Sequence, residues 1–227
     1  MRPMILAALV VLSVAAPARA QNIQVWPELG VFTRLNDSMR FYLLATTVKE
    51  NKESTEGEFG PNFDFYLRPL RNPRHLGPLA LDESKNRYLL LRVGYRYLNS
   101  FSSGPDEHRA VIEATPRFPL RAGVLVSSRN RVDLRSIDSE KSWRFRTRLS
   151  VEKPLSIGRV NMNPYARGEV YYDSRFHEWS RTEWMGGAAF PIRRRFELEG
   201  YFNYQNDTSG DVNRQVYAIG TVLNLYF

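Results

Sequence analysis

Acid–base or nucleophilic catalysis in this 227-residue chain would centre on its three histidines. A hydrolase needs a serine–histidine pair with an orienting group, or an aspartate–histidine pair. His177 lies four residues after Asp173 in a polar segment and is the best acid–base candidate, whereas His75 and His108 have weaker surroundings. A solvated loop histidine explains His177 more simply. We therefore predict no catalytic residue, and an enzyme remains the alternative interpretation.

Metal and cofactor chemistry has less support than catalysis. The chain has no cysteine, which excludes disulfides and cysteine-zinc sites. Its loop carboxylates do not follow the spacing of a calcium-binding loop: Asp37, Asp106, Glu107, Asp138 and Glu140. The glycines at 57–60 and 186–187 match no phosphate-binding loop. We predict no metal and no cofactor.

Arginine is the residue type that points to binding. Nine arginines recur at alternate positions between residues 109 and 167, together with four carboxylates. These thirteen candidates are Arg109, Glu113, Arg117, Arg129, Arg131, Asp133, Arg135, Arg144, Arg146, Arg148, Glu152, Arg167 and Glu169. The guanidinium fork stays charged and binds oxyanions bidentately. If this face lines a channel, nine cations against four anions favour anionic solutes.

The elements that must position these arginines alternate strictly between apolar and polar residues. In residues 143–151 the apolar face carries Trp143, Phe145, Leu149 and Val151, while arginines occupy the other face. This period of two predicts strands, and no sustained helical periodicity competes with it. Charged side chains on a lipid-facing surface would cost about 2–4 kcal/mol each for arginine. The arginine face is therefore expected to look inward.

Strand length separates a membrane barrel from a soluble sandwich. Soluble strands average about 5–6 residues, whereas a tilted membrane-spanning strand needs about 9–11. Eleven segments of about this greater length are predicted: 24–35, 39–48, 60–69, 87–98, 107–119, 121–134, 142–153, 160–173, 178–191, 194–204 and 214–227. We predict an all-β chain that forms a single antiparallel transmembrane β-barrel in a bacterial outer membrane.

The number of strands is less directly predicted. Bacterial single-chain barrels have even strand numbers with both termini in the periplasm, so we expect twelve strands, with ten as the alternative. Counting back from Phe227 places the acidic segment 49–60 outside the cell and makes residues 70–86 an unusually long periplasmic turn.

Both ends of the chain carry features of export. Residues 1–20 have a basic Arg2, an apolar run and a small-x-small site at Ala18 and Ala20, the layout of a cleaved secretory signal peptide. Its removal leaves residues 21–227 as the barrel domain, with 30 basic and 24 acidic residues. At the other end, the terminal strand has alternating apolar residues and a final phenylalanine, typical of the signal read by the barrel-assembly machinery: Tyr217, Leu223, Leu225 and Phe227.

Several strand patterns resemble one bacterial family. They are Trp26-Pro27-Glu28-Leu29, Gly94-Tyr95, the Glu113 strand, the arginines at 129, 131, 144, 146 and 148, the Glu169 strand, and Leu225-Tyr226-Phe227. Over nearly all of the mature chain this sequence resembles the domain-of-unknown-function 2490 (DUF2490) family of predicted outer-membrane barrels. The resemblance implies a fold and a location, and no activity.

Three functions remain open at this point. The first is a small porin-like or solute-binding barrel with an arginine-rich interior that favours anions. The second is an outer-membrane enzyme acting at the extracellular loops, and the third is a non-conducting structural or adhesive barrel. We expect contacts with outer-membrane lipid and with lipopolysaccharide phosphates, the latter through Arg175 and Arg181. Nucleic acid is not expected, because the basic residues lie on an alternating strand face.

Overall fold

The computed structural model describes residues 23–50, 53–70, 81–101, 104–209 and 213–227. Its elements are twelve strands and two short 3₁₀ turns. They are β1 (Ile23–Asn36), β2 (Met39–Glu50), β3 (Glu53–Pro69), η2 (Glu83–Asn86), β4 (Arg87–Ser100), β5 (Glu107–Pro119), η3 (Arg121–Gly123), β6 (Leu125–Ile137), β7 (Glu140–Glu152), β8 (Leu155–Ile157), β9 (Val160–Asp173), β10 (Glu178–Arg193), β11 (Phe196–Asp207) and β12 (Arg214–Tyr226). Within these ranges no helix has the length and apolarity to cross a membrane.

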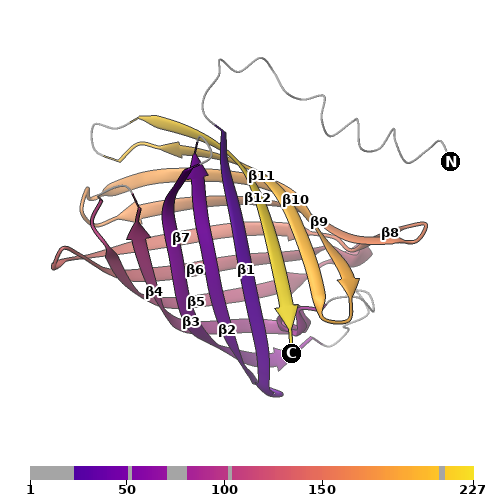
Figure 1. Ribbon diagram of the computed structural model, residues 1–227. Coiled ribbons are helices and arrows are strands. Elements are labelled where there is room, and N and C mark those ends of the chain that lie inside the picture. Colours follow the sequence, from indigo (N-terminus) through magenta and orange to yellow (C-terminus); the bar gives the residue numbers. More distant parts are fainter. Residues whose placement is uncertain (1–22, 51–52, 71–80, 102–103, 210–212) are drawn as a thin grey trace.

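The strands close into a barrel (Figure 1). Neighbouring strands of the ring pair antiparallel, and β7 pairs directly with β9 because β8 is not in the ring. The one parallel pair is β1 with β12. The parallel seam runs from Ile23 opposite Tyr217 to Phe32 opposite Tyr226. β8 lies outside the ring, where it forms a short hairpin with the start of β9. The all-β barrel predicted from the sequence is confirmed.

The parallel seam explains how a ring with an odd number of strands can close. A ring made only of antiparallel neighbours needs an even number of strands, whereas one parallel pair permits the eleven that close this barrel. The twelve strands expected are present, but β8 is outside the ring and was not among the predicted segments. Because β1 and β12 run in the same direction, β1 begins at the end opposite Phe227 (Figure 1). The expectation that both termini lie at one end is therefore not met.

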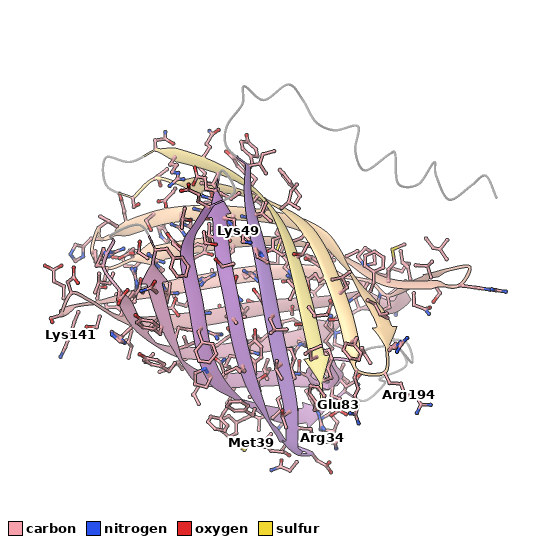
Figure 2. The ribbon with its side chains drawn as sticks, in the orientation of Figure 1. Arg34, Met39, Lys49, Glu83, Lys141 and Arg194 are labelled. Carbon is pink, nitrogen blue, oxygen red and sulfur yellow. The ribbon has the colours of Figure 1, made fainter. Side chains whose placement is uncertain are left out.

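We name the two ends of the barrel by their connections. The C-terminal end holds Phe227, the β1–β2 turn and the β10–β11 turn, and the opposite end holds the β6–β7 and β9–β10 turns. Figure 2 shows Arg34 and Arg194 at the C-terminal end and Lys141 at the opposite end. Segment 49–60, expected as an outer loop, is mostly strand in β2 and β3, so the β2–β3 connection at the opposite end is short.

The two faces of the wall follow the alternation of the sequence. Apolar side chains on the outward face are widely exposed, including Ile112 (54%), Leu149 (57%) and Phe202 (50%). Their neighbours Glu113, Arg148 and Asn203 point into the barrel, where Glu113 and Asn203 are buried. The inner face is therefore polar and the outer face apolar, the reverse of a soluble protein.

Two buried apolar clusters lie inside the barrel at its C-terminal end. Phe32 stacks on Tyr42 with ring centroids 4.3 Å apart and on Tyr226 at 4.9 Å. Leu70 and Leu125 form a second buried cluster beside Tyr88. The first cluster joins β1 and β2 to β12 across the seam, so it helps to fix the register of the seam.

Candidate functional site: the charged interior

The barrel encloses a cavity of about 940 Å³ along its interior. Fifteen arginines and Lys85 line it, against eleven carboxylates. Five more carboxylates are buried against the wall behind this lining: Asp64, Asp133, Glu169, Asp173 and Glu197. A solute in the cavity therefore meets more guanidinium groups than carboxylates, although the interior as a whole is close to balanced.

The thirteen arginines and carboxylates singled out from the sequence all lie on the inner face. Eleven of them line the cavity directly: Arg109, Glu113, Arg117, Arg129, Arg131, Arg135, Arg144, Arg146, Arg148, Glu152 and Arg167. The other two, Asp133 and Glu169, are buried at 0% and 3% exposure. Their part in binding a solute stays a prediction.

Glu169 on β9 organises the middle of the arginine face. Arg129 donates to its Oε1 at 2.7 Å, Arg146 donates to the same oxygen at 2.9 Å, and Arg148 donates to Oε2 at 2.6 Å. The alternation of β6, β7 and β9 brings these residues to one level, because each strand presents every second side chain inward. One carboxylate thus holds three cations, which leaves positive charge facing the cavity.

Two carboxylates organise the opposite end. Arg135 binds Glu107 through both Nε (2.5 Å) and Nη2 (2.7 Å), and Arg109 binds the same carboxylate at 2.8 Å. Asp173 accepts hydrogen bonds from Arg135, Arg144 and Arg175, between 2.8 and 3.2 Å. The mouth at this end is therefore a second arginine cluster, in which Asp173 is more buried than the arginines that bind it.

The C-terminal end is narrowed by η2, which the sequence did not reveal. Arg40 binds Asp64 at 2.7 Å and Asp82 at 2.6 Å, so it ties the segment before η2 to β3. Lys85 binds Glu152 on β7 at 2.7 Å. The stretch expected to be a long periplasmic turn thus returns into the barrel at residues 82–86. Residues 71–80 lie outside the described ranges.

The charges around η2 perturb its own groups. Burial raises the pKa of Asp82, but the positive charges of Arg40, Arg117 and Lys85 outweigh burial and hold that pKa below its usual range. Burial lowers the pKa of Lys85, but the carboxylates of Glu152, Glu197 and Asp82 hold it above its usual value. Both groups are therefore charged at neutral pH, and their ion pairs persist over a wide pH range.

Sequence reasoning missed the carboxylates on the far wall. Glu28 on β1, Glu58 on β3, and Glu183 and Glu199 on β10 and β11 line the cavity opposite the arginine strands. Glu199 accepts a hydrogen bond from Tyr165 and one from Arg167 at 3.1 Å. The alternation along β11 places Glu197 and Glu199 on the face opposite to that of Phe196 and Leu198, which indicates that they point inward. The count of inward charges from the sequence covered only residues 107–173.

The candidate catalytic pair does not form. Asp173 directs both carboxylate oxygens to arginines inside the barrel, whereas His177 lies in the exposed β9–β10 turn. His108 packs on the outer surface against Tyr97 and accepts or donates a 2.5 Å hydrogen bond with Tyr95. His75 is outside the described ranges. Among the residues that the structure describes, no three His, Asp or Glu side chains are grouped to hold a metal ion.

The remaining candidates are placed as follows. Arg175 and Arg181 line the cavity mouth, where Arg181 binds Asp207 at 2.5 Å and Arg175 binds Asp173 at 3.0 Å; their contact with lipopolysaccharide stays a prediction. Tyr217, Leu223 and Leu225 share the outward face of β12, and Phe227 closes the seam. The signal segment 1–20, with Ala18 and Ala20, lies outside the described residues.

Comparisons with known proteins match a family model and solved structures. A family model described as "Protein of unknown function (DUF2490)" matches residues 23–216. A solved structure described as "Bacterial polysaccharide outer membrane secretin" aligns with a TM-score of 0.47 and 10% identity, covering 85% of this chain and 87% of that chain. No curated protein matches this sequence.

Proposed function

The chain belongs to the DUF2490 family, and from its own interior we propose that it is an outer-membrane barrel that binds and conducts small anionic solutes. Its apolar outward face suits a bilayer, because each arginine placed there would cost about 2–4 kcal/mol. Its polar inward face offers a solute hydrogen-bonding groups along the whole cavity. The signal-like residues 1–20 and the terminal phenylalanine support export to the outer membrane.

One observation carries the preference for anions. Asp133, Asp173 and Glu169, with exposed fractions of 0%, 0% and 3%, lie deeper in the wall than the arginines of β6 and β7 that they bind. A dissolved ion interacts most strongly with the charges nearest to it, because Coulomb energy falls with distance and with the dielectric of the intervening water. Guanidinium groups therefore dominate the potential in the cavity.

A non-conducting barrel is the second candidate, and the ion pairs favour it. Glu169, Asp173 and Asp64 each bind two or more arginines, and η2 fills part of the C-terminal end. Such a network can fill a narrow barrel and rigidify it. The two candidates differ in whether ions cross the cavity.

Planar-bilayer recording of the refolded barrel under a KCl gradient separates them. We expect discrete channels whose reversal potential reports chloride selectivity. The variant Arg129→Gln/Arg148→Gln should lower that selectivity, whereas Arg194→Gln, at the exposed β10–β11 turn, should leave it unchanged. A correctly folded barrel without conductance would establish the non-conducting alternative instead.

A further inference from the structure

We propose that the interior selects solutes that carry both an anionic and a cationic group, held between the arginines of β6 and β7 and Glu28 of β1. This inference rests on the proposed function and names the solute class of the same cavity. It comes from the distribution of charge around the ring rather than from the excess of arginine.

One wall of the cavity is cationic. The contiguous strands β4 to β7 contribute ten arginines to the lining and only three carboxylates: Glu107, Glu113 and Glu152. Three guanidinium nitrogens on this wall are buried without a hydrogen-bond partner: Arg96 Nε, Arg129 Nε and Arg131 Nη2. Buried guanidinium N–H groups are normally satisfied by protein, water or ligand. Each of these nitrogens has less than 1 Å² of exposed surface, so an incoming carboxylate or phosphate would pair with them only after the guanidinium groups turn towards the cavity.

The facing wall is anionic. Strands β10 to β12 and β1 to β3 contribute seven carboxylates to the lining, against Arg40, Arg181 and Arg214. Glu28, Glu58, Glu183 and Glu199 lie among these carboxylates, and the charges of Glu28 and Glu199 both act on Tyr201, which lines the same wall. The two walls together impose an electric field across the barrel, perpendicular to its axis.

Glu28 is the carboxylate best placed to receive a cation. It is half-buried in the cavity, and among the described residues no ion pair or hydrogen bond engages its carboxylate. The charges that act on it most strongly are those of Glu199 and Glu58, followed by Arg96 on β4 and Arg148 on β7 in the arginine wall. Its other carboxylate neighbours, Glu58 and Glu199, are each bound to an arginine.

The transverse field distinguishes a zwitterion from a plain anion. An anion gains from the arginine wall but is repelled by Glu28, Glu58 and Glu199 on the facing wall. A solute with an additional ammonium group can pair with Glu28 while its acid group pairs with Arg129 or Arg148, so both interactions become favourable. Because like charges placed together are strongly disfavoured at a binding site, the ammonium group converts a repulsion into an attraction.

The test compares three probes on one carbon chain: 4-aminobutyrate, butyrate and butylammonium. Their binding to the refolded barrel in detergent is measured by calorimetry, and their block of channel current is measured in bilayers. We expect 4-aminobutyrate to bind about five- to tenfold more tightly than either single-charge probe. Glu28→Gln should abolish the advantage over butyrate, whereas Glu140→Gln, at the exposed β6–β7 turn, should retain it.

The two readouts separate this inference from the proposed conduction. Suppose that the barrel conducts no current but still prefers 4-aminobutyrate in detergent, and that Glu28→Gln loses this preference. That result supports the inference about the solute class and overturns only the proposal that the barrel conducts ions. A conducting barrel that binds butyrate as tightly as 4-aminobutyrate overturns the inference. An unchanged preference in Glu28→Gln also overturns it. Heat-modifiable migration on gels verifies that each variant is folded.

Discussion

Arg117 on β5 holds Ser84 of η2 inside the barrel with two hydrogen bonds. Its Nη1 donates to the Ser84 backbone oxygen at 2.8 Å, and its Nη2 donates to Ser84 Oγ at 3.0 Å. Both side chains are buried. The end of the β3–β4 connection is thereby fixed within the C-terminal end, and any solute crossing the barrel must pass beside it.

Replacing Arg117 by leucine tests this restriction. The Arg117→Leu substitution would leave the Ser84 oxygens without their donors, so we expect the free energy of unfolding to fall by about 1–3 kcal/mol. Freed from Arg117, η2 should also obstruct the cavity less, so single-channel conductance should rise. Urea unfolding and bilayer recording measure the two effects, with Arg121→Gln in the exposed turn η3 as control. Lower stability at unchanged conductance would show that η2 does not limit ion flow.

The lowered pKa of Asp82 leads us to expect that the stability of the barrel depends on pH. Because its folded pKa lies below its usual range, its stabilising contribution is complete above the unfolded pKa of about 4 and is lost as the pH falls towards the lower folded pKa. We expect the urea midpoint of the barrel to fall as the pH is lowered below about 5. Asp82→Asn should reduce this dependence, while Glu140→Gln should not. Parallel pH profiles for wild type and Asp82→Asn would contradict the assignment.

A separate prediction concerns the effect of the Glu169 charge on stability and on ion selectivity. Glu169→Gln removes the anion shared by Arg129, Arg146 and Arg148, which leaves three cations close together. We expect a loss of about 3 kcal/mol in the free energy of unfolding, since uncompensated buried charge is costly. In bilayers the same variant should become more anion-selective. A shift of the reversal potential towards cation selectivity would show that these arginines do not set the potential in the cavity.

The orientation of the wall can be tested on its outer face. Leu149 on β7 is widely exposed on the outward side, next to the inward Arg148. Leu149→Arg should destabilise the barrel in lipid by about 2–4 kcal/mol if it lies near the middle of the bilayer. Ile192→Arg, near the C-terminal end of the barrel, should cost about 0–1 kcal/mol. Equal costs at the two positions, measured by folding into vesicles, would contradict a membrane-spanning β7.

The strands and the arginine face were predictable because both follow from a local period of two. Segments such as 107–119 and 160–173 coincide with β5 and β9, since alternate apolar residues and flanking turn residues define their limits. The inward direction of Arg146 and Arg148 then follows from the cost of placing charge in lipid. Local pattern is sufficient for these features because neither requires knowledge of a distant partner.

The features that were missed depend on distant partners. The position of η2 is set by Arg40 and Arg117, which lie 42 and 33 residues from Asp82 and Ser84, and residues 70–86 have no periodicity that would reveal it. The parallel pairing of β1 with β12 likewise has no signature in either strand, because alternation is the same for both pairing directions. The acidic wall required the whole ring to be counted, from Glu28 to Glu199.

Phe227 gives a final prediction, which separates assembly from stability. Its backbone N–H donates to the Phe32 oxygen at 2.8 Å, and its backbone oxygen accepts from the Arg34 N–H at 2.8 Å, so it completes the parallel seam. Phe227→Ala retains both hydrogen bonds and removes only the aromatic ring, whereas deletion of Phe227 removes the bonds as well. If the ring is the assembly signal, Phe227→Ala should refold in detergent with a nearly unchanged urea midpoint and yet accumulate poorly in the outer membrane of cells. The deletion should lower the free energy of unfolding in detergent by about 1–3 kcal/mol, for two backbone hydrogen bonds. Normal membrane levels of Phe227→Ala, measured in fractionated cells, would restrict the role of Phe227 to closing the seam.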